Sequence, residues 1–228
     1  DEEIHMILDA VSDHPFLNTW IHILLYTGMR PSEALALTYD DISFKSKSIK
    51  INKTLSFSQD LDEVTKKPCG KLFPIITDLK NYRENGRSNY QIRTLIVSDK
   101  VLSTIKDWMI RIVLQPKLLM NKKFWGTEKY LFCNPSGQLT LYRYRAQTYR
   151  RHLIKKGIDP SRYNLYRFHH NYCTRLLRLE QDVKTVQMIM GDNDATMILG
   201  VYANMNQEDV VNGCTAYNDN MDYTLQSS

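Results

Sequence analysis

The chain has 228 residues, of which 43% are hydrophobic, and this is enough for one large domain or a domain with a small appendage. Its net charge of +5 and pI near 8.9 permit a polyanionic partner without demanding one. The four cysteines lie far apart and form no CxxC pair, which is typical of reduced thiols and predicts neither a disulfide framework nor a metal site. No apolar run approaches the length of a membrane span and no signal peptide opens the chain, so we expect no membrane partner and a cytoplasmic location.

The first part of the chain predicts helices. Apolar residues recur at helical spacing over residues 2–12, and the more uniformly apolar segment 16–26 is typical of a buried helix. Gly28 breaks the pattern, and a proline in first-turn position predicts a further helix over 31–37. Arg30 therefore precedes a helix N-terminus, where backbone donors would help it to hold an anion. The alternative is a surface arginine at a helix start, which on spacing alone is the commoner case.

The pattern then changes to strands. Over residues 41–57, apolar and polar residues alternate on either side of a Lys-Ser-Lys-Ser turn, which predicts strands, and another strand is predicted over 92–97. The segment between them, 58–90, is polar and irregular, and we expect it to form a long loop. A helix with one broad apolar face is expected next, with Asp99 as its N-terminal cap.

A basic and aromatic segment, residues 142–156, carries the strongest compositional signal for nucleic acid. Its arginines and lysines are interleaved with tyrosines at helical spacing, so that cations would meet phosphates while tyrosine hydroxyl groups add contacts. The alternative is a solvated basic helix that packs its tyrosines inward. The residues expected to contact DNA are Arg143, Arg145, Arg150, Arg151 and Lys155.

The last predicted elements are two amphipathic helices. They cover residues 168–179 and 183–190, and Gly191 is expected to close the second. Asp194 is a candidate cap for a final helix that leads to Tyr202, a tyrosine expected in a short polar break.

Residues 27–33, Thr-Gly-Met-Arg-Pro-Ser-Glu, resemble the TGxRxSE box of the tyrosine recombinases, the integrase family that includes phage and conjugative-transposon integrases. In that family the arginine is the first of two that clamp the scissile phosphate, and the resemblance gives this role to Arg30. Segment 87–97 is similar to the family's KTxxSxRTIPL β-hairpin, with Arg93 in its later part. On this alignment Arg87 takes the position of the lysine that acts as general acid.

A later segment resembles the family's second box, HxLRH, which is followed by a helix, a Gly-His pair and the nucleophilic tyrosine. Aligned without gaps, Tyr166 takes the position of the first histidine and His169 that of the second arginine. Asp192 then takes the position of the histidine in the Gly-His pair, and Tyr202 that of the nucleophile. The spacing between these positions agrees with that of many members.

A second register of this box remains open. It places Arg167 on the second arginine and Asn164 on the first histidine, and it requires an insertion. We prefer the register without gaps.

The resemblance covers essentially the whole chain and implies a single catalytic domain over residues 1–228, with a C-terminal tail over about 206–228. The implied fold is that of the DNA breaking-rejoining enzymes, which is α+β and mainly α-helical, with a small three-stranded antiparallel sheet. Family members carry a helical core-binding domain before the catalytic domain, and we expect that domain to be absent from this chain.

The resemblance also implies a chemistry. Tyr202 would attack a DNA phosphodiester in line, forming a 3′-phosphotyrosine and releasing a 5′-hydroxyl, with neither a metal nor a nucleotide cofactor. Four positions depart from the family pattern. Arg87 keeps the charge of the lysine but is a poor proton donor, and His169 offers one or two donors instead of the fork of a guanidinium group. Tyr166 is a weak base near neutral pH, and Asp192 brings negative charge toward a phosphate.

Three functions are compatible with these residues. The first is a site-specific DNA recombinase or integrase of a mobile element, which acts on double-stranded DNA as a tetrameric synapse and is compatible with a monomer in isolation. The second is a catalytically impaired relative that binds DNA or occupies an assembly without cutting. The third and weakest is a nicking-closing enzyme of the type IB topoisomerase kind.

Overall fold

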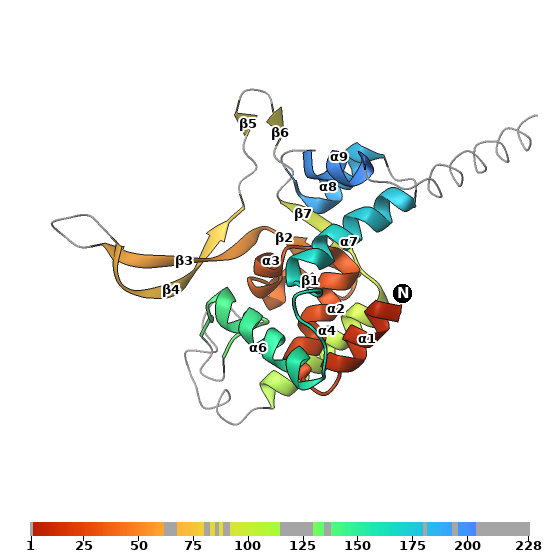
Figure 1. Ribbon diagram of the computed structural model, residues 1–228. Helices are drawn as coiled ribbons and strands as arrows, with labels where there is room; N and C mark the ends of the chain where they lie inside the picture. Colours follow the sequence, from red (N-terminus) through yellow and green to blue (C-terminus); the bar gives the residue numbers. More distant parts are fainter. Residues whose placement is uncertain are drawn as a thin grey trace, which may run out of the picture.

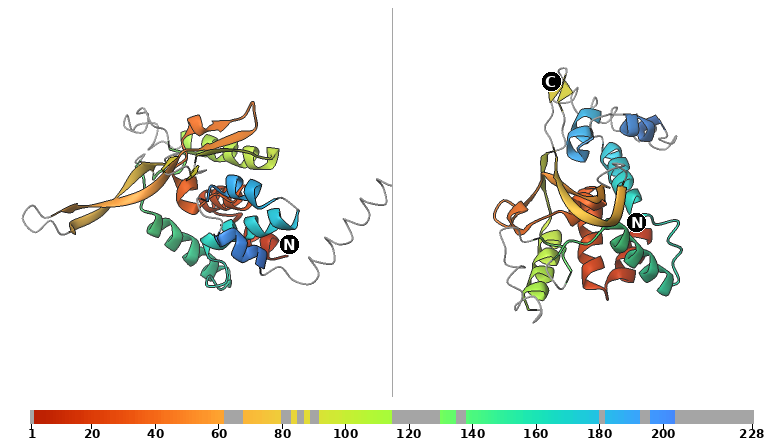
Figure 2. Two further views of the ribbon diagram at one scale, coloured as in Figure 1. Left: turned by 90° about the horizontal axis from the view of Figure 1, so that it is seen from above. Right: turned by 90° about the vertical axis from the view of Figure 1, so that its left-hand side faces the viewer.

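The computed structural model consists of a mainly helical body from which a long β-hairpin projects (Figure 1). The view from above also shows this hairpin projecting from the body (Figure 2, left). The structure describes residues 2–61, 68–79, 83–84, 87–88, 92–114, 130–134, 138–179, 182–192 and 196–203.

The N-terminal helices build the centre of the main core. α1 (Glu2–Val11) and α2 (Pro15–Thr27) confirm the first two predicted helices. α2 begins on a proline, whose missing N–H costs nothing in the first turn, and it ends at Gly28, whose φ of 60° favours glycine. Trp20 of α2 is fully buried. α3 (Pro31–Leu35) is shorter than predicted because the chain turns from it toward the sheet.

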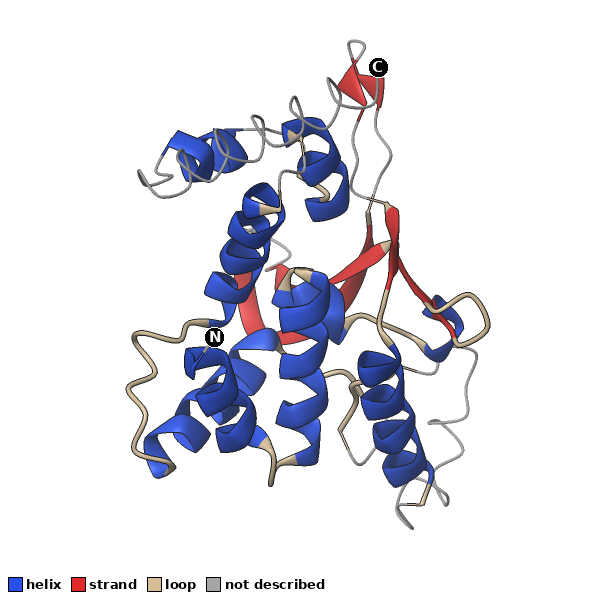
Figure 3. Cartoon of the chain, turned by 90° about the vertical axis from the view of Figure 1, so that its right-hand side faces the viewer, coloured by secondary structure: helices blue, strands red, loops and turns tan. Residues whose placement is uncertain are grey.

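Three antiparallel strands form the predicted small sheet among the helices (Figure 3). They are β1 (Ile42–Ser43), β2 (Ser48–Ile51) and β7 (Arg93–Ile96), in the order β1-β2-β7. Buried and exposed residues alternate along β7, as the period of a half-buried strand requires. The register pairs Ile51 with Arg93, so β2 fixes the position of Arg93.

The prediction of an irregular loop over 58–90 is wrong. Most of the described residues in this segment belong to strands. β3 (Lys53–Leu61) and β4 (Pro68–Asp78) pair into the long antiparallel hairpin, and β5 (Arg83–Glu84) pairs with β6 (Arg87–Ser88).

Cross-strand pairs explain the long hairpin. Leu55 lies opposite Ile76, and Phe57 lies opposite Pro74, so apolar side chains meet on one face of the ribbon. Thr54, Ser56 and Ser58 alternate with the apolar residues of β3, whereas the unbroken apolar run 72–76 hides the strand period in β4. Each strand of a two-stranded ribbon is an edge strand, which is why Pro74 is tolerated without a backbone N–H.

The two helices that follow occupy the predicted segments. They are α4 (Asp99–Val113) and α6 (Tyr142–Lys155). The predicted cap of α4 is wrong by one position, because Ser98 has the extended backbone of an N-cap residue. Asp99 instead lies in the first turn, where a negative charge interacts favourably with the helix dipole.

The last helices are α7 (Leu165–Arg178), α8 (Val183–Met190) and α9 (Thr196–Ala203). α7 begins earlier than predicted because the side chain of Asn164 caps it, accepting a hydrogen bond from a backbone N–H at 3.0 Å. α8 has the predicted bounds, and Gly191 closes it with a φ of 67°.

Two predictions near the end of the chain have different outcomes. Tyr202 lies within α9, so the expected polar break at this position is wrong. The candidate cap Asp194 and the predicted tail over 206–228 lie outside the described residues.

The buried apolar residues form two separate clusters. The larger cluster contains residues of the helices from α1 through α4, of the three-stranded sheet, and of parts of α6 and α7. The smaller holds α7, α8 and α9 together and consists of Cys173, Leu177, Val186, Met190 and Ile198. In the part of the chain that the structure describes, Cys69, Cys133 and Cys173 are free thiols. No described helix is long and apolar enough to cross a lipid bilayer.

Candidate active site

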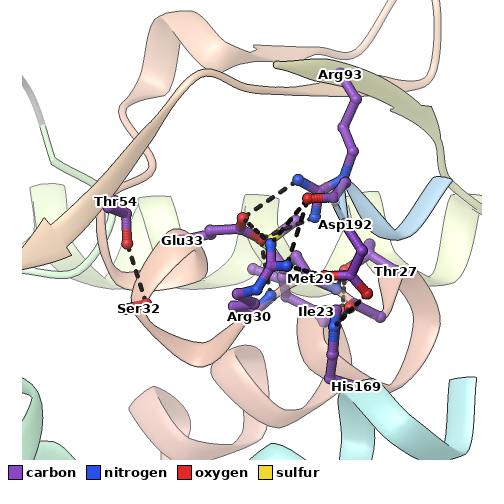
Figure 4. Close-up of polar contacts among 12 residues, drawn as sticks. Ile23, Thr27, Met29, Arg30, Ser32, Glu33, Thr54, Arg93, His169 and Asp192 are labelled. Atoms are coloured by element: carbon purple, nitrogen blue, oxygen red, sulfur yellow. Dashed lines mark hydrogen bonds and ion pairs between the residues drawn. The ribbon is translucent and has the colours of Figure 1, made fainter. Parts of the chain in front are cut away.

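Arg30 is the N-cap residue of α3, and its side chain contacts Glu33 in the same helix and two residues at the end of α8 (Figure 4). Its backbone N–H donates to Glu33 Oε2 at 2.8 Å, and its Nη1 donates to Glu33 Oε1 at 3.0 Å. Its Nη2 donates to the carboxylate of Asp192, and both Nη atoms lie 3.4 Å from the carbonyl oxygen of Gly191. Arg30 therefore joins the first box of the sequence to the end of α8.

Glu33 and Arg93 form a buried ion pair behind Arg30. Nη2 of Arg93 donates to Oε2 of Glu33 at 2.8 Å, and Nη1 donates to Oε1 at 3.2 Å, a two-pronged geometry that fixes both groups. Burial raises the pKa of the Glu33 carboxyl, but the charges of Arg93 and Arg30 outweigh it and hold that pKa below its ordinary value. The pair ties β7 of the sheet to the arginine box.

Arg93 also packs against the turn that follows α8. A Cβ atom added to Gly191 would lie 2.8 Å from Cζ of Arg93, so only glycine fits beneath this guanidinium group. The sequence comparison placed Arg93 in the family's strand motif without giving it a role. The structure makes it a positioning residue for Arg30, acting through Glu33.

His169 of α7 reaches the same site from a third direction. Its imidazole is 1% exposed, and its Nδ1 forms a hydrogen bond with the carbonyl oxygen of Gly28 in the first box. Because a carbonyl oxygen only accepts, Nδ1 carries the proton. Its Nε2 faces Oδ2 of Asp192 at 3.8 Å, which is too long for a hydrogen bond. Within the described structure, neither of these two buried atoms has a hydrogen-bond partner.

Asp192 is a carboxylate among cations. Burial raises the pKa of this carboxyl, but His169 and Arg30 outweigh burial, and the pKa lies below its ordinary value. Burial lowers the pKa of Arg30, but the charges of Glu33 and Asp192 outweigh burial, and this pKa lies above its ordinary value. Both groups of the Arg30–Asp192 pair are therefore charged at neutral pH.

Tyr166 and Arg167 lie in the first turn of α7, where their side chains are exposed. The ring of Tyr166 lies 5.5 Å from that of His169, measured between centroids, so it borders the site. Arg167 instead donates a hydrogen bond to the carbonyl oxygen of Arg162, away from Arg30. This arrangement supports the register that places His169, and not Arg167, on the second-arginine position.

Two predicted site residues are described only by their backbone. Tyr202 belongs to α9, which packs against α7 and α8, and Arg87 belongs to β6. The short hairpin of β5 and β6 rises at the same end of the domain as α8 and α9 (Figure 1). The roles of Tyr202 as nucleophile and Arg87 as general acid stay predictions.

The predicted DNA-contacting residues divide into two groups. The side chains of Arg143, Arg150, Arg151 and Lys155 are exposed on α6. Arg145 is half-buried, with Cζ 4.3 Å from the ring centroid of Phe16 and Nη2 donating to Thr140 Oγ1 at 3.3 Å. Burial lowers the pKa of Arg145. These two contacts show that its guanidinium group packs on Phe16 and Thr140 within the protein.

A pocket of about 510 Å³ connects α6 to the candidate site. Its lining includes Arg143 of α6, Tyr166 of α7, and Pro31 and Ser32, which directly follow Arg30 in the sequence. Phe57 on the long hairpin lines its other side. Arg143 of α6 and Tyr166, which borders the candidate site, therefore line one pocket.

Comparison with known proteins shows a family from the sequence and a shared fold from solved structures. Residues 1–209 match the model of the phage integrase family. A curated protein of Caldanaerobacter subterraneus subsp. tengcongensis, a tyrosine recombinase XerC-like protein, is 23% identical over 221 residues. The match covers 96% of this chain and 53% of that protein, so the chain spans about half the length of this relative.

Solved recombinases have the same fold. The Tn1549 transposon integrase in complex with circular intermediate DNA superposes with a TM-score of 0.70 at 20% identity, covering 95% of this chain and 66% of that one. The same integrase in complex with transposon right end DNA gives a TM-score of 0.69, also at 20% identity, with 95% and 64% covered. The XerA recombinase gives 0.63 at 15% identity, with 95% and 63% covered. These similarities confirm the predicted catalytic-domain fold.

Proposed function

Because the chain belongs to the phage integrase family, we propose that it is the catalytic part of a site-specific DNA recombinase of a mobile element. It cuts and rejoins double-stranded DNA in the cytoplasm through a 3′-phosphotyrosine on Tyr202. The observation that carries this proposal is the meeting of Arg30 with Asp192, 162 positions away, beside His169. These are three of the positions that the two sequence boxes assign to one phosphate site.

The geometry supplies several of the groups that such a reaction needs. A guanidinium group fixed by Glu33 suits the negative charge that develops on a phosphate under in-line attack. The Nε2 atom of His169 points toward the same place and is a second donor when the ring is protonated. The exposed hydroxyl-bearing ring of Tyr166 borders the site. The side chains of Arg87 and Tyr202 complete the proposal as proton donor and nucleophile.

Double-stranded DNA is the proposed partner. The side chains of Arg143, Arg150, Arg151 and Lys155 on α6 are exposed, and their charge suits the phosphate backbone of a duplex. Arg143 also lines a pocket with Pro31 and Ser32, which directly follow Arg30 in the sequence. The Tn1549 integrase, which has this fold, was solved in complex with its DNA. We extend the proposal to self-association of the chain on DNA, as a synapse requires.

Covalent capture tests the proposed function. The chain is incubated with nicked suicide duplexes tiled across the DNA that flanks its own gene, and protein–DNA adducts are separated on denaturing gels. We expect an adduct on at least one duplex, and we expect Tyr202→Phe to abolish it while DNA binding persists. An adduct that survives in Tyr202→Phe would remove this tyrosine as the nucleophile.

A second function is favoured by one observation. The Arg30 guanidinium is already paired with a carboxylate, and an imidazole stands where the family has its second arginine. These features suit a relative that binds DNA without cutting it. Binding to flanking DNA with no adduct on any duplex, across pH 5.5 to 8, supports this alternative over the recombinase.

The division of the basic residues on α6 yields a prediction about salt. Replacing both Arg150 and Arg151 by glutamine is expected to weaken duplex binding and to reduce the slope of log K against log salt by about 2, because each phosphate neutralised contributes about 0.9. The measurement is fluorescence anisotropy across a salt series. Arg145→Met, checked for folding by circular dichroism, is the control and should leave the slope unchanged, because this cation packs on Phe16. Equal slopes for wild type and the double variant would remove these residues from the interface.

A further inference from the structure

Asp192 occupies the face of Arg30 that a phosphate would need. Its Oδ1 accepts a hydrogen bond from Nη2 of Arg30, while Nη1 of that arginine is taken by Glu33 (Figure 4). The position corresponds to a phosphate-contacting donor in the sequence pattern, yet a carboxylate only accepts. Nη2 also lies 3.4 Å from the carbonyl oxygen of Gly191, so both of its N–H groups face protein acceptors and an anion that binds there has to take the place of Asp192.

The charges around Arg30 already cancel. Two guanidinium groups, Arg30 and Arg93, face two carboxylates, Glu33 and Asp192. A phosphate entering this set would add a negative charge to a neutral group, which is unfavourable in a half-buried place. Movement of Asp192 away from the site restores the positive charge that holds an anion.

Except for Arg30, the neighbours of Asp192 bind its carboxylate only weakly. Its Oδ2 atom is buried without a hydrogen-bond partner in the described structure, and the nearest ring atom, Nε2 of His169, is 3.8 Å away. Nδ1 of His169 donates to Gly28, so Nε2 attracts Asp192 only when the ring is protonated, and in the neutral ring Nε2 is an acceptor that faces another acceptor. Asp192 also directly follows Gly191 at the C-terminal end of α8, where the helix dipole disfavours negative charge.

We infer that Asp192 is a specificity-determining residue that competes with phosphate for Arg30, excludes free anions, and yields only to a phosphate carried by DNA. The inference rests on the proposed function of Arg30 as the phosphate-binding group. Free phosphate gains only the contacts of the site, so its apparent affinity is the intrinsic affinity multiplied by the fraction of molecules in which Asp192 has moved away. A DNA phosphate is delivered by the cations of α6 at high effective concentration, and this offsets the competition.

Titration with inorganic phosphate tests this inference. Wild type, Asp192→Asn and the double variant Asp192→Asn, Arg30→Gln are compared by isothermal titration calorimetry at constant ionic strength and pH 7.5. We expect Asp192→Asn to bind phosphate at least about tenfold more tightly than wild type, which corresponds to a paired form that outnumbers the open form ten to one. The double variant should lose this gain. Asp99→Asn, which removes the carboxylate of the exposed Lys47–Asp99 pair, is the matched control and should behave as wild type.

The outcomes separate clearly. Equal phosphate affinity in wild type and Asp192→Asn overturns the inference, and so does a gain that persists in the double variant, because the anion then binds elsewhere. Duplex affinity supplies the specificity readout. Asp192→Asn is expected to change it by a smaller factor than it changes phosphate affinity, and an equal or larger change in duplex affinity contradicts the selection for DNA.

The test is independent of DNA cleavage. If phosphate binding follows the expected pattern while no covalent adduct forms on any duplex, the proposed recombinase activity fails and the role of Asp192 stands. If adducts form while Asp192→Asn gains no phosphate affinity, the recombinase proposal stands and the role of Asp192 fails.

Discussion

Arg30→Lys is expected to lower the rate of DNA cleavage by about 10²–10³, although the charge is kept. The guanidinium group holds Glu33 with one Nη atom and presents the other to Asp192 or to a phosphate. A lysine ammonium is a single point donor on a flexible stem and cannot keep both contacts in one plane. Loss of one preorganised donor to a developing charge typically costs this factor. The measurement is the single-turnover rate of covalent adduct formation at saturating DNA.

Two comparisons make the result specific to the phosphate contact. Arg143→Lys changes the same residue type at an exposed position of α6 and should leave the single-turnover rate within about threefold. Duplex affinity of Arg30→Lys should also stay close to wild type, because one contact among many is altered. A cleavage rate for Arg30→Lys within about threefold of wild type would exclude Arg30 as a two-pronged phosphate ligand.

Glu33→Gln is expected to lower the free energy of unfolding by about 3–5 kcal/mol. Glu33 is 1% exposed and joins Arg93 to Arg30, so the substitution leaves buried guanidinium charge without its carboxylate. The measurement is urea denaturation at pH 7 followed by circular dichroism. Because the pKa of Glu33 is held below its ordinary value, its stabilising contribution is present above the unfolded-state pKa and is lost as pH falls through the folded-state pKa. The difference in the free energy of unfolding between wild type and Glu33→Gln should therefore become smaller at acidic pH.

A matched surface pair provides the scale for this effect. Lys47 and Asp99 lie 2.8 Å apart with side chains that are 54% and 77% exposed, and Asp99→Asn is expected to cost no more than about 1 kcal/mol. Combining Glu33→Gln with Arg93→Leu should cost less than the sum of the two single variants, because the second change removes the orphaned charge. If Glu33→Gln lowers the free energy of unfolding as little as Asp99→Asn does, the buried pair contributes little to stability.

Elements with strong local signals were predictable from the sequence. α8 has its predicted bounds because its ends are set locally, by Asp182 as a cap that accepts from Thr185 and by Gly191 in the left-handed region. α2 was predicted equally well, since an apolar run of that length has to be a buried helix in so small a protein.

The long hairpin was missed because its stability comes from pairing across the chain. β3 contains several serine, threonine and glutamine residues, whereas β4 contains the unbroken apolar run 72–76, and their apolar pairs, such as Leu55 with Ile76, are formed only when the strands meet. A short stretch of sequence contains only one residue of each cross-strand pair, so it does not reveal the stabilising contact. The error in the cap of α4 is of a different kind, since Ser98 and Asp99 are both good cap residues and the backbone chooses between them.

The candidate site was predictable in outline and not in its interactions. Motif order and spacing brought Arg30, His169 and Asp192 into one hypothesis, and the structure places all three together. The pairing of Glu33 with Arg93 was not foreseen, because the two residues lie 60 positions apart and neither is unusual in its local sequence. The direct contact of Asp192 with Arg30 was missed for a related reason, since the family pattern has a donor at that position.

The division of the core into two clusters has a consequence for motion. α9, whose backbone carries Tyr202, is anchored through Ile198 in the small cluster on α7 and α8, and none of its described side chains belongs to the large cluster. We expect such a small cluster to open locally at a free energy below that of global unfolding. The proposed nucleophile would then shift its position while Glu33 and Arg93 keep Arg30 fixed to the main core. The fold separates the stability of the phosphate site from the mobility of the attacking group.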